Sequence, residues 1–205
     1  PSGQYGDLLG GANITVGCKK CIAGRYSNEV KQSIDSDAAA DGEMCKWCPA
    51  GTWRNEEGAT HESMCKNCVA GKYSEARASK NESNCDSCIP GRYLSTPGAD
   101  NEKKCSPCRK GKYNDASGQT YCIKCESGKF QPQQEAADCK DCASGRSSNN
   151  VARTNTCDIC KKGRHQPDKG ATACFKCIPG KFQSQRGLTN CTDCAVGRAS
   201  SRKAR

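Results

Sequence analysis

Apolar residues are sparse along the chain and follow no helical period. Leu, Ile, Val and Phe together make up 19 of the 205 residues, and no window places them every three or four positions. What recurs is a short string, as in Cys88-Ile-Pro-Gly-Arg-Tyr93, in which a Cys is followed by Gly, a cation and an aromatic ring. The Gly predicts a turn or a close backbone approach that a side chain would block. The cation and ring predict a brief strand whose ring covers a disulfide.

The string belongs to a tenfold array. All 20 cysteines fall into ten Cys-x-x-Cys pairs, and in every pair Gly is the third residue after the second Cys. Lys or Arg follows this Gly in nine pairs, with Thr52 as the exception. An aromatic residue comes next in seven pairs, and the departures are Ser147, His165 and Ala199. A fixed short period of this kind indicates a stack of small units.

The spacing of the pairs divides the chain into classes of repeat. We expect the tail of a truncated repeat at 1–17, a long first repeat at 18–44, three repeats of 20 residues at 45–104, five repeats of about 17 residues at 105–190, and the start of a further truncated repeat at 191–205. The 20-residue class differs by three residues inserted around a second turn, where loop length changes at little cost. Residues 29–44 are expected to hold a turn or two of helix.

Composition indicates how such a chain folds. With a formal net charge of +10, the low apolar content alone would predict disorder. The 20 cysteines argue the opposite, because covalent cross-links can replace a hydrophobic core. We therefore predict disulfide-rich small repeats with little regular secondary structure, only short β segments and turns. They would form an elongated rod or solenoid-like array without a single globular core.

The same features predict an extracellular or cell-surface location. Regularly placed cysteines suit an oxidising compartment, where disulfides persist. Glycosylation tripeptides begin at Asn13 and Asn81, and a third begins at Asn190, whose middle residue Cys191 is expected in a disulfide. Because no apolar run approaches membrane-spanning length, we expect no membrane insertion in this segment.

Three disulfide schemes are compatible with paired cysteines. Each pair could close on itself, neighbouring pairs could cross-link two by two, or the second Cys of each pair could bond the first Cys of the next. The spacers between pairs are 23, 16, 16, 16, 13, 13, 14, 13 and 13 residues, without the alternation that the second scheme requires. We predict the serial scheme, which makes all units equivalent: Cys21–Cys45, Cys48–Cys65, Cys68–Cys85, Cys88–Cys105, Cys108–Cys122, Cys125–Cys139, Cys142–Cys157, Cys160–Cys174 and Cys177–Cys191. Cys18 and Cys194 are left over and are expected to bond cysteines outside this segment.

The run Cys85-Asp-Ser-Cys88-Ile-Pro-Gly91-Arg92-Tyr93 resembles the cysteine-rich repeats of ephrin-receptor type. It is also similar to the first half-module of tumour-necrosis-factor-receptor repeats, in which the Cys before x-x-Gly-x-Tyr pairs with the next Cys along. The resemblance implies an elongated extracellular rod, of a kind common in surface proteins of protists, and it identifies no ligand. The second half-module of the receptor family is absent here, which weakens a receptor interpretation.

Other chemistries find little support in the sequence. Paired Cys-x-x-Cys motifs also bind zinc, but the even spacers and the glycosylation tripeptides argue against a metal. Covalent haem requires His directly after the pair, and no pair has one. The two histidines, His61 and His165, are far apart, and His165 occupies the aromatic position as a ring substitute. We therefore expect no enzyme, no catalytic residues and no cofactor.

The cations after each Gly are the remaining candidate for binding. If the units stack in register they form a row, consisting of Arg25, Lys72, Arg92, Lys112, Lys129, Arg146, Arg164, Lys181 and Arg198. Such a row could hold an acidic polysaccharide or the acidic face of a neighbouring subunit. The alternative is a solvated edge whose cations pair locally with Asp or Glu. Nucleic acid is not expected as a partner.

Three functions remain open at this point. The first is a structural, self-associating segment of an extracellular filament, such as a flagellar hair or a surface coat. The second is the ligand-binding stalk of a membrane receptor. The third is an intracellular zinc-binding scaffold, which free thiols in the native protein would reveal.

Overall fold

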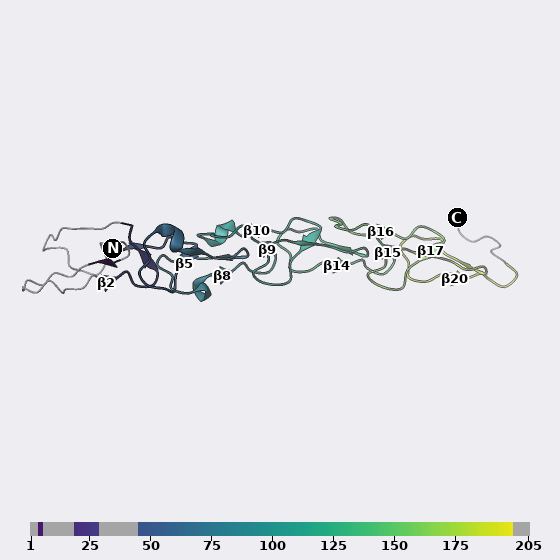
Figure 1. Ribbon diagram of the computed structural model, residues 1–205. Helices are drawn as coiled ribbons and strands as arrows, with labels where there is room; N and C mark the ends of the chain where they lie inside the picture. Colours follow the sequence, from purple (N-terminus) through teal and green to yellow (C-terminus); the bar gives the residue numbers. More distant parts are fainter. Residues whose placement is uncertain (1–3, 6–18, 29–44, 199–205) are drawn as a thin grey trace, which may run out of the picture. The chain divides into compact units, whose positions relative to one another are not determined.

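The computed structural model describes residues 4–5, 19–28 and 45–198 (Figure 1). Within these residues the chain forms strands of two residues each, joined by turns and loops. The antiparallel pairs are β1 Gln4–Tyr5 with β2 Lys19–Lys20, β3 Arg25–Tyr26 with β4 Lys46–Trp47, β5 Thr52–Trp53 with β6 Lys66–Asn67, β7 Lys72–Tyr73 with β8 Asp86–Ser87, β11 Lys112–Tyr113 with β12 Ile123–Lys124, β13 Lys129–Phe130 with β14 Lys140–Asp141, β15 Arg146–Ser147 with β16 Asp158–Ile159, β17 Arg164–His165 with β18 Phe175–Lys176, and β19 Lys181–Phe182 with β20 Thr192–Asp193. Strands β9 Arg92–Tyr93 and β10 Ser106–Pro107 complete the series.

Each hairpin follows directly from the repeated string. Its first strand is the two residues that follow the Gly, in most repeats a cation and a ring, and its second strand is the two residues between the next pair of cysteines. The Gly lies in a tight turn, in which the amide after it donates back to the carbonyl of the residue after the second Cys, as from Lys112 to Arg109 at 3.0 Å. This turn closes in all ten repeats, as the sequence predicted, and few residues have any other regular structure.

The described residues divide into two compact units that interleave along the chain. The first comprises the described residues up to 88 together with 94–106 and 117–120. The second comprises 89–93, 107–116 and the described residues from 121 onward. Both units are built from the same hairpins and the same disulfides.

Nine serial disulfides confirm the predicted pairing. They join Cys21–Cys45, Cys48–Cys65, Cys68–Cys85, Cys88–Cys105, Cys108–Cys122, Cys125–Cys139, Cys142–Cys157, Cys160–Cys174 and Cys177–Cys191. Half-cystines make up 14 of the 18 buried apolar residues of the described chain. The interior therefore consists of small disulfide clusters. Cys194 carries a free thiol, and Cys18 lies outside the described residues, so their bonds to an outside cysteine stay a prediction.

Neighbouring repeats are joined by three main-chain hydrogen bonds. The Gly128 amide donates to the Ser148 carbonyl at 2.7 Å, Gln131 to Arg153 at 2.9 Å, and Ala152 back to Cys125 at 2.7 Å. The equivalent three bonds recur at eight successive junctions, from the pair Gly24 and Arg54 to the pair Gly163 and Gln183. Because main-chain groups alone make them, this interface does not depend on which side chains the repeats carry.

Each turn Gly from Gly24 to Gly145 also lies close to the main chain of the repeat that comes second after its own. A Cβ on Gly145 would lie 1.9 Å from the carbonyl oxygen of Gly187, and a Cβ on Gly71 would lie 1.9 Å from that of Gly118. The same approach recurs from Gly24 to Gly145 in every repeat. Gly is thus required by the space available as well as by the turn.

The three extra residues of the longer repeats form a short helix. The 3₁₀ helices η1 Glu62–Met64, η2 Glu82–Asn84 and η3 Glu102–Lys104 each lie directly before the closing Cys of a 20-residue repeat. In η2 the Asn81 amide donates to Asn84 Oδ1 at 3.1 Å. No helix occupies this place in the described 17-residue repeats. The helical turn expected within 29–44 lies outside the described residues.

Replacing Gly145 by Ala should destabilise its repeat far more than replacing Gly180 by Ala. Both glycines have positive φ, +76° and +84°, so either change costs about 1 kcal/mol of backbone strain. No atom of the described residues lies within 4 Å of a Cβ on Gly180, whereas overpacking at Gly145 adds about 1–3 kcal/mol. Hydrogen exchange of the Gly187 amide reports both variants, and equal acceleration by the two would contradict the close approach.

Replacing Ala152 by Gly should stabilise the protein. Ala152 lies at φ +54°, where most other repeats carry Gly in the second turn, and its amide donates to Cys125. The substitution removes the strain of a left-handed backbone at Ala152, and Gly loses more entropy than Ala on folding. The net effect is a rise of about 0.5–1 kcal/mol in the free energy of unfolding. Slower hydrogen exchange at position 152 would record it. The control Ala137→Gly, at an exposed residue without positive φ, should bring no gain.

Candidate functional site

The aromatic rings connect successive repeats. Tyr26 packs in one buried cluster with Cys48 and Ala59 of the following repeat and with Cys65, whose disulfide to Cys48 closes that repeat. Its hydroxyl donates to Glu62 Oε2 at 2.9 Å. Burial, reinforced by the hydrogen bond to Glu62 and its charge, raises the pKa of Tyr26. The ring therefore covers a disulfide, as expected, and that disulfide is the one in the next repeat.

Tyr73 has the same relation to the repeat after it. It packs against the cluster of Cys88, Leu94, Ala99 and Cys105. Burial also raises the pKa of this phenol, with smaller contributions from nearby carboxylates.

Two of the three departures from the aromatic position, Ser147 and His165, face the next disulfide, and the third, Ala199, lies outside the described residues. Ser147 Oγ lies 3.3 Å from Cys174 Sγ, and His165 Nδ1 lies 3.1 Å from Cys191 Sγ. His165 thus stands where a ring stands in other repeats, and its own ring contacts Phe175 at a centroid distance of 5.9 Å. His165, Cys177 and Cys191 could form a metal-ligand triad, but the two sulfurs are bonded to each other, so neither offers a thiolate.

His61 has a separate, local role. It precedes η1, and its Nδ1 accepts from the Ser63 amide at 3.3 Å.

A buried polar position is the feature that sequence reasoning missed. The third residue after the Gly is buried in nine repeats, and in three of them it is Gln131, Gln166 and Gln183. Gln131 Nε2 donates to the Asp138 carbonyl at 2.8 Å, and its Oε1 accepts from the Gln133 amide at 3.0 Å. Each Gln thereby ties its strand to the loop before the closing Cys. The recurrence of Gln at one offset was the available signal.

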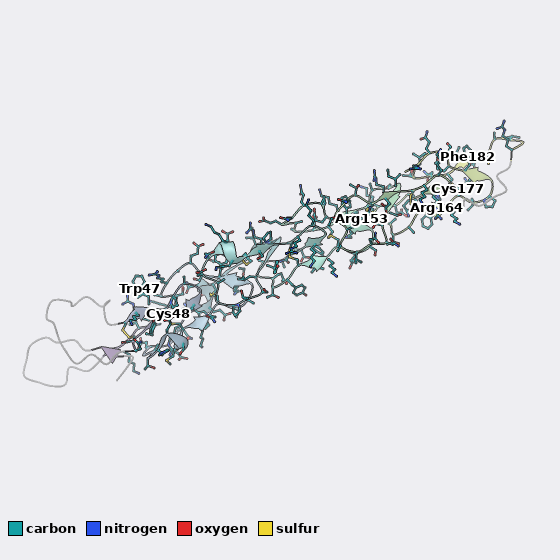
Figure 2. All side chains as sticks on the ribbon, turned by 90° about the horizontal axis from the view of Figure 1, so that it is seen from above. Trp47, Cys48, Arg153, Arg164, Cys177 and Phe182 are labelled. Atoms are coloured by element: carbon teal, nitrogen blue, oxygen red, sulfur yellow. A yellow bond between two sulfur atoms is a disulfide. The ribbon has the colours of Figure 1, made fainter. Side chains whose placement is uncertain are left out.

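Most cations of the expected row have local partners. Lys129 Nζ is 3.6 Å from Asp141, Lys181 Nζ is 2.9 Å from Asp193, and Arg92 pairs with Glu135. Arg146 donates to the Cys157 carbonyl, Arg164 donates to the Cys174 carbonyl, and Arg25 lies 5.7 Å from the Trp47 ring centroid (Figure 2). Lys72 and Lys112 are half-buried and Arg198 is exposed. Lys129, Lys181 and Arg92 thus pair locally with Asp or Glu, which is the alternative to a row of free cations. Binding of an acidic partner stays a prediction.

Arg153 is a cation that the sequence did not single out (Figure 2). It donates to Asp158 at 2.7 and 3.1 Å and to the Thr156 carbonyl at 2.8 Å. The hydrogen bond from this guanidinium lowers the pKa of Asp158. Because the pKa of Asp158 is lower in the folded protein than in the unfolded chain, its pairing with Arg153 stabilises the fold at a pH above the unfolded-state pKa. This stabilisation is lost as the pH falls through the folded-state pKa of Asp158.

Two of the three glycosylation tripeptides lie in the described part of the chain. The side chains of Asn81 and Asn190 are exposed, although Cys191 in the second tripeptide is bonded to Cys177. Asn13 lies outside the described residues. Occupancy by glycan stays a prediction for all three.

Replacing Gln131 by Leu should destabilise the second unit by about 1–2 kcal/mol, because the Asp138 carbonyl and the Gln133 amide lose their partner. Thermal unfolding followed by circular dichroism measures the loss. The matched control Gln133→Leu, at an exposed side chain, should stay within about 0.5 kcal/mol of the wild type. A Gln131→Leu variant as stable as this control would show that the buried amide does not hold the loop.

Comparison with known proteins agrees with this geometry. Residues 38–85 and 96–142 match the family model described as tyrosine-protein kinase ephrin type A/B receptor-like. A search of curated proteins found no match. Among the described residues, no helix is both long and apolar enough to cross a membrane. Two matches to one family model, which together cover under half of the chain, and nine serial disulfides show a cysteine-rich repeat array that is similar to repeats of ephrin-receptor-like type.

Proposed function

We propose that this chain is a structural segment of an extracellular or cell-surface assembly of filament or coat type. The observation that supports it is the main-chain interface that recurs, with the same three hydrogen bonds, at eight successive junctions. An interface made by the backbone joins repeats of any side-chain composition. Such a module serves as a spacer or a building unit, and its function needs no pocket.

The disulfides support the proposed location. Nine bridges in one short chain persist where the surroundings are oxidising, and they occupy cysteines that a zinc scaffold would need as thiolates. The repeat family is of the extracellular receptor type, which agrees with this location.

A ligand-binding ectodomain stalk is the second candidate. The match to the ephrin-receptor-like family model favours it, and the repeat fold suits it equally. The two candidates differ in partner, because a filament segment binds copies of itself and a stalk binds a different molecule.

Self-association of the purified, oxidised chain tests the proposal. Sedimentation velocity and negative-stain electron microscopy over a range of concentrations should show linear oligomers. The double variant Cys18→Ser and Cys194→Ser should shorten them if the leftover cysteines join subunits covalently. A chain that stays monomeric at every concentration, and binds a single surface receptor or ligand saturably, would favour the stalk and reject the filament.

A further inference from the structure

Two hairpins of the second unit concentrate positive charge. We call them the basic hairpins, and they comprise Arg109, Lys110, Lys112 and Lys124 in one and Lys161, Lys162, Arg164 and Lys176 in the other. In each, both residues between the second Cys and the Gly are basic. In the other eight repeats neither of these residues is Lys or Arg.

The turn gathers three of the four cations in each basic hairpin. The Lys112 amide donates to the Arg109 carbonyl at 3.0 Å, and the Arg164 amide donates to the Lys161 carbonyl at the same distance. A turn closed in this way brings its first and fourth Cα atoms within about 7 Å of each other. Lys110 and Lys162 lie between them at the tip.

The strand pairing adds the fourth cation directly opposite. Lys112 is the cross-strand partner of Lys124, and Arg164 is the partner of Lys176. Like charges in this arrangement destabilise a hairpin. At the equivalent register of two other hairpins of this unit, Lys129 faces Asp141 and Lys181 faces Asp193, and both pairs form ion pairs.

The charge of the basic hairpins is accessible and not neutralised. Six of the eight side chains are exposed, and Lys112 and Arg164 are half-buried. Within the part of the chain that the structure describes, none of the eight forms an ion pair with a carboxylate. Arg164 Nη1 donates to the Cys174 carbonyl, which leaves its charge in place (Figure 2).

We propose that the basic hairpins bind a polyanionic polysaccharide, whose sulfate or carboxylate groups supply the negative charge that these hairpins lack. Clustered ammonium and guanidinium groups attract such groups electrostatically and donate hydrogen bonds to them. The inference rests on the extracellular location of the proposed function, where polysaccharides are abundant. It goes beyond a uniform row of cations, because it selects two repeats and adds the residues at the turn tip and on the opposite strand.

Two equivalent clusters on one chain suit a long, repeating polyanion. Once one hairpin is bound, the second meets the same polymer at a high effective concentration. A nucleic acid is the competing class of polyanion, and the disulfide-rich character of the chain favours the polysaccharide because disulfides belong to oxidising, extracellular surroundings.

The test compares two pairs of substitutions that copy residues from neighbouring repeats. Lys124→Asp with Lys176→Asp places Asp where Asp141 and Asp193 stand, and Lys110→Ala with Lys162→Ala places Ala where Ala23 and Ala50 stand. The control Lys80→Asp with Lys140→Asp makes the same change in net charge at exposed lysines outside the basic hairpins. Binding of the oxidised full-length chain to immobilised heparin and to polygalacturonate is measured by surface plasmon resonance across a salt series.

The wild type should bind at least one of the two polysaccharides with an affinity that falls as salt rises. The Asp pair should weaken binding at least tenfold, the Ala pair about threefold, and the control pair less than twofold. Binding to heparin alone assigns sulfate as the recognised group, and binding to polygalacturonate assigns carboxylate.

Three results would overturn the inference. They are no binding of the wild type at physiological salt, equal losses in the Asp pair and the control pair, and tighter binding to single-stranded DNA of equal charge. Because the purified chain is used, failure here leaves the self-association experiment untouched. Failure of self-association likewise leaves the binding result valid.

Discussion

The disulfide that runs from each cysteine pair to the next holds this protein together. Of the described chain, only Tyr26, Ala59, Leu94 and Ala99 join the half-cystines among buried apolar residues. So little apolar burial cannot offset the entropy of ordering the chain. Each bridge closes a loop of about 15 residues and contributes roughly 3 kcal/mol in the chain-entropy account. Covalent closure of every repeat therefore takes the place of a hydrophobic core.

Closure of single repeats does not by itself order one repeat against the next. That order comes from main-chain hydrogen bonds, from the ring laid on the following disulfide, and from turn glycines that approach a carbonyl two repeats further on. The first and third of these require no particular side chain beyond the Gly. The buried position after the ring accordingly accepts residues as different as Ser74, Leu94 and Gln131 with the same backbone bonds.

This backbone-based interface leaves the outer face of each hairpin free to vary. At one register the chain places a cation opposite a carboxylate, an aromatic ring, or another cation without changing the fold. Substitutions on the outer face of selected repeats can thus change what those repeats bind while the fold of the array stays the same. The basic hairpins are the clearest example, because the cations that distinguish them, at the turn and on the opposite strand, are exposed.

The disulfide pairing, the turn at each Gly and the brief strand after it were predictable from the sequence. The even spacers argue against cross-linking the pairs two by two and suit the serial scheme, and a short local string specifies turn and strand. The structure added the contacts between repeats: which disulfide Tyr26 covers, which carbonyl lies against Gly145, and which cation pairs with Glu135. These contacts depend on distances between repeats, which the spacing within a single repeat does not encode. Gln131 instead bonds main-chain groups of its own repeat, and the sequence marks its position only by the recurrence of Gln at one offset.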